Sequence, residues 1–201
     1  MDVIYLQPSL WCFGSMRMFL DHAADFAAWK FAQDLVWEKQ NGSGFHADRF
    51  KRVHEHMAHW YRGEWGSLYR SIVTTPDAVK RQVRRKGRPP HMGHIDATPY
   101  ESEDGGPRMM RSVLYHANCH GYAIHRTQKP VALLQPLIEY SCPPEGVVYV
   151  PFAGSGSELE AARSLGRRAV GVEIDESMCE KAAERLTSTL PLVVERSEAI
   201  S

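Results

Sequence analysis

The chain has 201 residues, 43% of them hydrophobic, which is enough for one domain with a real core, or one domain with an appendage. Its 24 basic and 24 acidic side chains give a formal net charge of zero, so overall charge indicates no particular partner. The four cysteines form no C-x-x-C pair, which favours reduced thiols over a disulfide framework. With no apolar run of roughly 18 residues and no visible leader, we expect a cytoplasmic protein without a membrane partner.

The N-terminal part of the chain predicts strands around one helix. In chain order the pattern gives a strand interrupted at Pro8, a helix and two further strands, at residues 3–13, 16–30, 34–38 and 50–61. The turn residues at 41–44 predict a loop between the last two strands.

Residues 74–111 show little periodicity and are rich in proline, glycine and charge. A stretch this long without regular structure inside a compact domain is usually functional or disordered. Basic side chains are concentrated in it at Lys80, Arg81, Arg84, Arg85, Lys86 and Arg88.

The C-terminal part predicts helices alternating with short buried strands. In chain order these are a helix, a strand, a helix, a strand and a helix, at residues 130–140, 148–150, 157–165, 169–174 and 176–186. Strands that alternate with helices predict a parallel sheet with right-handed crossovers, hence an α/β fold of the doubly wound type.

The turn that follows residues 148–150 is the most informative feature of the sequence. It contains Gly154 and Gly156, and the next predicted strand carries Glu173 at its C-terminal end. A strand, a glycine turn, a helix and an acid-tipped strand make the minimal pocket for a nucleoside-bearing cofactor, because backbone N–H groups approach the ligand and the acid accepts ribose hydroxyls. No lysine follows the glycines, so phosphate binding is less favoured, and a purely structural turn stays open.

A second motif, His125-Arg126-Thr127-Gln128-Lys129-Pro130, precedes this turn. Together with Pro-Phe-Ala-Gly-Ser-Gly-Ser at 151–157 it resembles the β-class DNA amino-methyltransferases, and residues 35–39 and 50–55 extend the likeness, particularly to phage and prophage versions. These enzymes transfer a methyl group from S-adenosylmethionine to the exocyclic amino group of adenine or cytosine in DNA. The resemblance implies a Rossmann-like, circularly permuted fold, which explains the late position of the glycine turn.

The resemblance also implies the residues of a cofactor site. Phe152 and the two glycines would shape the turn, the serines and Lys129 would bind the methionine carboxylate, and Glu173 would bind the ribose. The full set is Thr127, Lys129, Phe152, Gly154, Ser155, Gly156, Ser157 and Glu173. An exposed charge at a helix end is the alternative interpretation of Lys129.

The basic residues fall where the family places target recognition. We therefore expect residues 1–75 to form part of the methyltransferase sheet, 76–112 to form a basic recognition insert, and 113–201 to bind the cofactor. The six cations would contact phosphates of double-stranded DNA, which positions DNA without specifying bases. A solvated loop is the alternative.

The histidines raise the question of a metal. His54, His56 and His59 are close in sequence, but on a strand the first two share a face and His59 points the other way. We therefore expect no metal site. Phe45, in the glycine loop, is a candidate for stacking on a flipped base.

The sequence departs from the family in its catalytic motif, Asp/Asn/Ser-Pro-Pro-Tyr/Phe/Trp. The two Pro-Pro pairs are followed by His91 and Glu145, and only ten residues precede Trp11. We therefore expect an N-terminally truncated enzyme without catalytic residues of its own, inactive alone, and served by a complementing N-terminal fragment or a homodimer.

Two further positions differ from the family. Val150 stands where the family usually has Asp, and Arg126 where it often has Pro. Loss of that carboxylate would weaken cofactor binding. A degenerate DNA-binding protein, a prophage remnant, and an RNA or protein methyltransferase are the alternatives.

Overall fold

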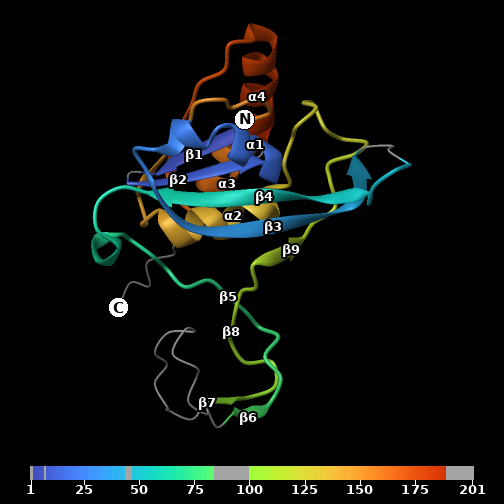
Figure 1. The fold of residues 1–201 in the computed structure, drawn as a ribbon. Coiled ribbons are helices and arrows are strands. Elements are labelled where there is room, and N and C mark those ends of the chain that lie inside the picture. The colour runs from blue at the N-terminus through green and yellow to red at the C-terminus, as the bar shows by residue number, and fades with distance from the viewer. Residues whose placement is uncertain (1, 7, 44–46, 84–99, 189–201) are drawn as a thin grey trace, which may run out of the picture. The chain divides into compact units, whose positions relative to one another are not determined.

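The computed structural model describes residues 2–6, 8–43, 47–83 and 100–188 (Figure 1). The chain divides into two compact units, one formed by Met1–Ser71 with Ser112–Ser201 and the other by Ile72–Arg111. Each unit has its own strand pairing, and the predicted cofactor residues all belong to the larger unit.

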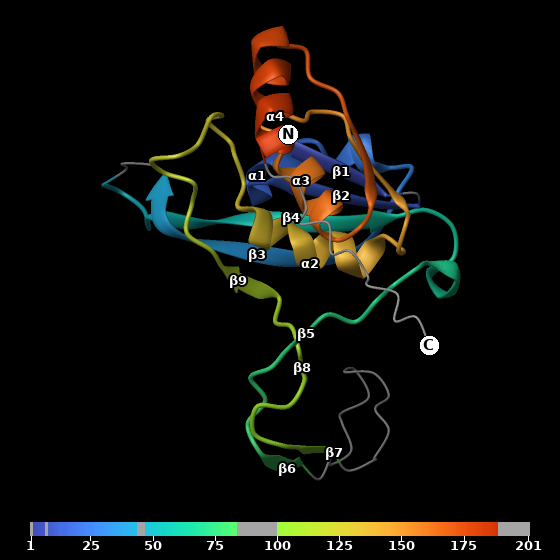
Figure 2. The same ribbon diagram turned by 180° about the vertical axis from the view of Figure 1, so that it is seen from behind.

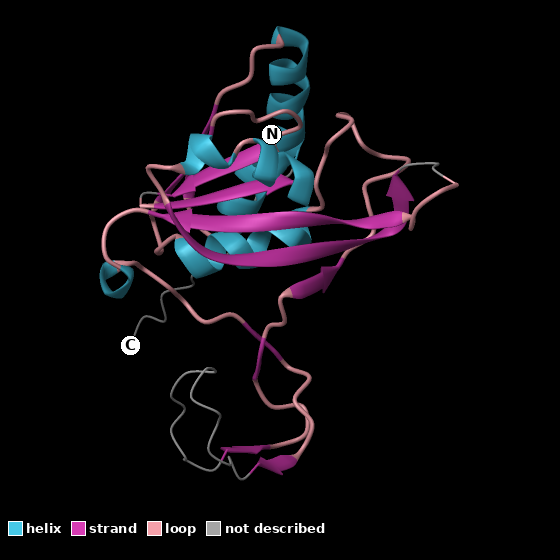
Figure 3. Ribbon diagram, viewed as in Figure 1, coloured by secondary structure: helices cyan, strands magenta, loops and turns pink. Residues whose placement is uncertain are grey.

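In the described part of the chain, the larger unit is built on a seven-stranded sheet (Figures 1 and 3). Its strand order is β11 (Arg168–Gly171), β10 (Val147–Val150), β1 (Asp2–Leu6), β2 (Ser9–Gly14), β4 (Arg52–Tyr61), β3 (Lys30–Ser43) and β9 (Val113–Tyr115). The predicted parallel pair β10–β11 is confirmed. The pairs from β10 through β1, β2 and β4 to β3 are antiparallel, so the sheet is mixed rather than parallel throughout.

Short connections explain two of the four antiparallel pairs described in this sheet, β1–β2 and β3–β4. The turn at Pro8 joins β1 to β2, and a hairpin joins β3 to β4. Connections this short leave no room for the crossover that parallel neighbours need. The α/β class is confirmed, with helices packed on both faces of the sheet.

Alternate residues of β2, which is labelled in Figure 2, pack against two different layers. Leu10 and Cys12 pack with Phe26 on the side of α1 (Met16–Asp21) and the 3-10 turn η1 (Ala23–Phe26). Trp11 lies on the other side, where its indole N–H donates to Ser141 Oγ of α2 (Val131–Ser141) over 2.8 Å. The helix predicted over 16–30 is shorter than expected because Phe26 enters the core from η1 rather than from a continuous helix.

Strand β3 is longer than predicted and includes residues 41–43, where the turn residues had predicted a loop. Gly42 has a packing role there, since a Cβ atom on it would lie 2.4 Å from the carbonyl oxygen of Arg52. The loop prediction at 41–43 is therefore wrong, and Gly44 and Phe45 lie outside the described residues.

The smaller unit contains short strand pairs where no regular structure was expected. β5 (Thr74–Thr75) pairs with β8 (Arg108–Met109), and β6 (Arg81–Val83) pairs with β7 (Tyr100–Ser102), both antiparallel. In the larger unit, η2 (Trp65–Ser67) follows β4.

The C-terminal helices position the turn after β10. α3 (Ser157–Ser164) and α4 (Glu176–Ser188) confirm the two helices predicted there. Val148 and Val150 of β10 are buried beneath the layer of α2 and α3. Four side chains of α2 are also buried in this layer: Leu133, Leu134, Leu137 and Ile138. Over the residues described, none of the helices combines the length and apolar character needed to cross a membrane.

Candidate cofactor-binding site

An open pocket lies where β10 ends. Two segments that are distant in sequence form it, the one before α2 and the turn before α3. Its lining residues are His125, Thr127, Gln128, Lys129, Phe152, Ala153, Gly154, Ser155 and Glu158. The structure thus brings together the two motifs on which the sequence prediction rested.

The two glycines of the turn adopt left-handed backbone conformations. Gly154 has φ +48° and Gly156, the N-cap of α3, has φ +72°. A Cβ atom would lie 3.3 Å from His125 Nδ1 at Gly154 and 3.3 Å from the Cβ of Ala182 at Gly156. Backbone conformation and close packing both therefore require glycine here.

Glu173 follows β11 and is bonded to the same turn. Its carboxylate accepts hydrogen bonds from the backbone N–H groups of Gly154 (2.8 Å), Ile174 (2.9 Å) and Asp175 (3.1 Å). These bonds, first that from Asp175 and then that from Gly154, lower the pKa of Glu173 below its ordinary value. The predicted ribose acceptor is therefore an ionised group held against the glycine turn.

Lys129 is only 3% exposed, so its alternative interpretation as a solvated helix-end charge is wrong. It lies directly before Pro130, the N-cap of α2, and its Nζ is 4.5 Å from the centre of the Phe13 ring. A lysine that is buried and also lines a pocket offers a compact cation to an anionic ligand group.

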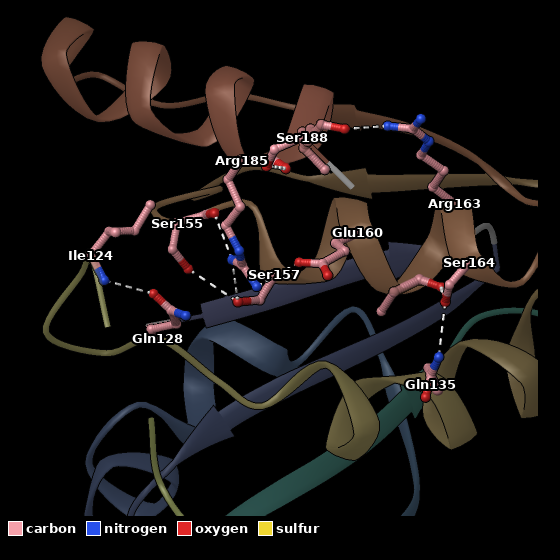
Figure 4. A network of polar contacts seen from close by, with 12 residues as sticks. Ile124, Gln128, Gln135, Ser155, Ser157, Glu160, Arg163, Ser164, Arg185 and Ser188 are labelled. Carbon is pink, nitrogen blue, oxygen red and sulfur yellow. Dashed lines mark hydrogen bonds and ion pairs between the residues drawn. The ribbon is translucent and has the colours of Figure 1, made fainter. Parts of the chain in front are cut away.

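The hydroxyls of the two serines of the turn point toward one another (Figure 4). Both are buried, and their hydroxyls are 3.1 Å apart. Ser155 lines the pocket, whereas the Ser157 hydroxyl accepts a hydrogen bond from Arg185 of α4 over 3.1 Å. Arg185 also donates to the Ser155 carbonyl (2.9 Å) and pairs with Glu160 (2.5 Å). Ser157 therefore ties the turn to α4, and Ser155 is the serine placed for a ligand.

Thr127 and Phe152 are the exposed members of the predicted site. The Thr127 hydroxyl is 3.1 Å from His125 Nδ1, and Phe152 is 58% exposed at the pocket. Behind them the side-chain oxygen of Gln128 accepts from the backbone N–H of Ile124 over 2.9 Å (Figure 4). All eight predicted cofactor residues thus lie in or directly beside the glycine turn and the 127–129 segment.

Sequence reasoning missed four pocket residues: His125, Gln128, Ala153 and Glu158. His125 opens the motif on which the family resemblance rests, and its ring lies against Gly154. Glu158 shares a helical face with the fully buried Ala161 and Ala162, which is the signal that could have indicated its burial. Val150, by contrast, is 1% exposed and is not part of the lining.

Of the six predicted DNA-binding residues, Lys80 and Arg81 are described. The backbone N–H of Lys80 donates to Asp104 over 2.6 Å, and its Nζ is 3.7 Å from Glu103. Arg81 lies in β6. Arg84, Arg85, Lys86 and Arg88 lie outside the described residues.

The histidines of β4 behave as their alternation predicted. The rings of His54 and His56 are neighbours, 5.3 Å apart, while His59 stacks on Trp11 in the core. Among the residues that the structure describes, no three His, Cys, Asp or Glu side chains are grouped to hold a metal ion.

Solved structures with the same architecture are DNA methyltransferases. M1.HpyAVI with S-adenosylmethionine has a TM-score of 0.58 at 20% identity, over 89% of this chain and 74% of that one. TTHA0409 of Thermus thermophilus, named as a DNA modification methylase and complexed with S-adenosyl-L-methionine, has a TM-score of 0.53 at 18% identity. The match covers 91% of this chain and 70% of that one. The cytosine-N4-specific PvuII DNA methyltransferase has a TM-score of 0.52 at 15% sequence identity, over 86% of this chain and 60% of that one. The fold is therefore the Rossmann-like fold of such methyltransferases.

Sequence comparison narrows this class to one family. The family model of the N6/N4-type DNA methylases matches residues 4–184, so the chain belongs to that DNA methylase family. YubD of Escherichia coli (strain K12), named as a methylase, is 45% identical over 146 residues, 69% of this chain and 59% of that protein. The Type II methyltransferase M.HinfI of Haemophilus influenzae is 38% identical over 189 residues, which are 91% of this chain and 47% of that protein. The chain spans about half the length of these curated relatives.

Proposed function

We propose that this chain is the cofactor-binding and DNA-binding part of a site-specific methyltransferase that uses S-adenosylmethionine to methylate the exocyclic amino group of adenine or cytosine in DNA. The observation that carries the proposal is the pocket in which the 125–129 segment meets the glycine turn, with Lys129 buried beside it. Its relative M.HinfI is a Type II methyltransferase, which supports a role in restriction and modification.

The residues of the pocket fit a nucleoside that carries an amino acid. Glu173 is an ionised acceptor for ribose hydroxyls, and the exposed Phe152 and Ile174 offer apolar surface to a nucleobase. Lys129 provides a compact cation for a carboxylate. When bound, S-adenosylmethionine supplies an activated methyl group, and the residues of this chain hold and orient it at the carboxyl end of β10.

Calorimetry of the purified chain with S-adenosylhomocysteine, the stable demethylated product, tests this role. We expect measurable binding, and Lys129→Met should weaken it about 10- to 100-fold, because a hydrogen bond to a charged group contributes about 1.5–3 kcal/mol. Lys181→Met on the exposed side of α4 is the matched control, since Lys181 is a solvent-exposed lysine away from the pocket lining. Absence of binding by the unmodified chain would contradict the proposal.

We assign the contacts with DNA phosphates to the basic residues of the 76–112 segment. We also expect the protein to act in the cytoplasm of a bacterial or phage-infected cell. Each cation that neutralises a phosphate releases counterions, so affinity should fall with salt. The four cysteines, free in the structure, agree with a reducing compartment.

The family's catalytic tetrapeptide is not found in the 201 residues, since neither Pro-Pro pair stands in an Asp/Asn/Ser-Pro-Pro-aromatic context. We propose that a polypeptide segment with this tetrapeptide completes the site, and that the chain transfers no methyl group alone. One part of the described sheet supports this. Val147, Tyr149 and Val170 are 39–51% exposed, and the register Val147↔Arg168 and Tyr149↔Val170 places them on one face of β10–β11, called here the open face.

The open face is unusual because parallel strands are normally covered on both sides. A segment that covers the open face would bring its tetrapeptide next to the glycine turn. A second copy of the chain is the other candidate to cover this face.

Transfer of labelled methyl groups to unmethylated DNA tests the proposed division of labour. The chain alone should incorporate no label, and addition of the upstream part of a relative, with its tetrapeptide, should produce incorporation. The same fragment with the tetrapeptide aspartate changed to alanine is the control. Robust incorporation by the chain alone would contradict the proposal.

A second candidate function is a degenerate methyltransferase that binds DNA without using the cofactor, or a prophage remnant. The apolar Val150, buried where related enzymes usually place a carboxylate, favours it. DNA binding without cofactor binding would support the degenerate protein, and loss of both activities would support the remnant.

A further inference from the structure

The pocket contains a buried carboxylate that no motif assigned. Glu158 is 6% exposed, belongs to the first turn of α3, and lines the pocket together with Lys129 and Ser155. We propose that Glu158 binds the ammonium group at the amino-acid end of the cofactor. This inference rests on the proposed cofactor-binding function.

The position of Glu158 on α3 is suited to a charged group. It faces inward with Ala161 and Ala162, both fully buried, so the helix presents its carboxylate to the interior. The N-terminal end of a helix stabilises a negative charge, which lowers the cost of burying it there. A cationic ligand group in the pocket would lower that cost further.

The other acidic residue of this turn has a different partner. Glu160 pairs with Arg185 of α4 and is not part of the pocket lining. The same helix therefore carries one carboxylate that holds α4 and one that faces the pocket. This makes Glu160 the matched control for Glu158.

The charges of the pocket match the two charges of a free amino-acid group. Lys129 is a buried cation and Glu158 a buried anion, and a zwitterionic amino acid presents a carboxylate and an ammonium group. Val150 has only a hydrocarbon side chain and is buried on the side of the sheet that faces α2 and α3. Glu158 is thus the residue of the turn whose chemistry suits the ammonium group.

The experiment compares two ligands that differ at this end. S-adenosylhomocysteine has the amino-acid group, and 5′-methylthioadenosine lacks it. By calorimetry, Glu158→Gln should weaken S-adenosylhomocysteine about 10- to 100-fold and change 5′-methylthioadenosine by less than about twofold. Glu160→Gln should leave the ratio of the two affinities unchanged, and Glu158→Asp should recover part of the loss.

A ligand variant tests the same contact without a protein variant, in case Glu158→Gln fails to fold. The 2-oxo analogue of S-adenosylhomocysteine keeps the carboxylate but has a carbonyl in place of the carbon that carries the ammonium group, and it should bind the unmodified chain about 10- to 100-fold more weakly. Equal weakening of both ligands by Glu158→Gln, or full affinity for the 2-oxo analogue, would overturn the inference while leaving cofactor binding intact. If the unmodified chain binds none of these ligands, both the inference and the proposed function fail.

Discussion

At the scale of single residues, His59 is the clearest case of a group whose protonation opposes folding. It is fully buried, stacks on Trp11 with ring centres 4.5 Å apart, and neither ring nitrogen has a hydrogen-bond partner in the described structure. Burial lowers the pKa of His59 to about 4 from an ordinary value of 6.5. The folded protein therefore holds this histidine neutral under conditions in which the unfolded chain protonates it.

This predicts a loss of stability in mild acid. Between pH 6.5 and pH 4 the unfolded state binds more protons at His59, so stability is fully present above pH 6.5 and falls as the pH decreases. From pH 7.5 to pH 5 the free energy of unfolding should decrease by about 2 kcal/mol from this residue. Urea unfolding of the wild type and of His59→Phe at both pH values measures it, and an equal decrease in the variant would refute the assignment.

The backbone at Gly156 gives a second prediction at this scale. Gly156→Ala places a side chain on a left-handed residue and brings its Cβ within 3.3 Å of the Cβ of Ala182. The left-handed conformation alone should cost about 1–2 kcal/mol, and the contact should add to it. Gly166→Ala is the control, because Gly166 has φ +71° but nothing within 4 Å of its Cβ position. Thermal unfolding should show a larger decrease at Gly156 than at Gly166.

At the scale of elements, α4 is connected to the glycine turn mainly through polar contacts. Ala182 is its only buried residue among those described, and Arg185 reaches Ser155, Ser157 and Glu160. The packing of α4 therefore depends largely on Arg185, whereas α2 is held by an apolar face that is buried in the core.

Arg185→Ala should loosen α4 and with it the turn. We expect faster amide hydrogen exchange throughout α4 and a loss of about 1–3 kcal/mol, because Glu160 and the Ser155 carbonyl lose a charged donor. Lys181→Ala, on the exposed surface of the same helix, should leave exchange unchanged. Unchanged exchange in both variants would show that other contacts hold α4.

The sequence predicted the elements whose boundaries have local chemical causes. The succession β10–α3–β11–α4 was expected, because glycines end its strand and helix and the apolar runs are short. The antiparallel middle and the length of β3 were missed because partner strands decide them: Gly42 looked like a turn residue but lies against Arg52.

The same limit applies to the site. The motifs located both sides of the pocket, but local sequence could not show that Ser157 faces α4 or that Lys129 is buried. Glu158 was missed because its burial depends on packing of α3 against the sheet, although Ala161 and Ala162 indicated the buried face of that helix.

At the scale of the whole molecule, the prediction concerns which part binds DNA. The double variant Arg84→Ala/Arg85→Ala should weaken binding of every duplex similarly and reduce the slope of log affinity against log salt by about 2, since each phosphate contact contributes about 0.9. Arg17→Ala in the larger unit is the control, an arginine whose side chain is 90% exposed. Filter-binding titrations at several salt concentrations measure both, and an unchanged slope would exclude these arginines from the contact.

The open face of β10–β11 also bears on how the chain behaves at high concentration. Sheet edges that show apolar side chains and unpaired backbone groups are templates for aggregation, and β11 is an edge strand. We expect light scattering of the purified chain to rise with concentration, and Val170→Lys on β11 to suppress that rise. Scattering that stays equally low in both proteins would show that this surface does not self-associate. If the scattering does rise, any partner that covers the open face should also keep the chain in solution.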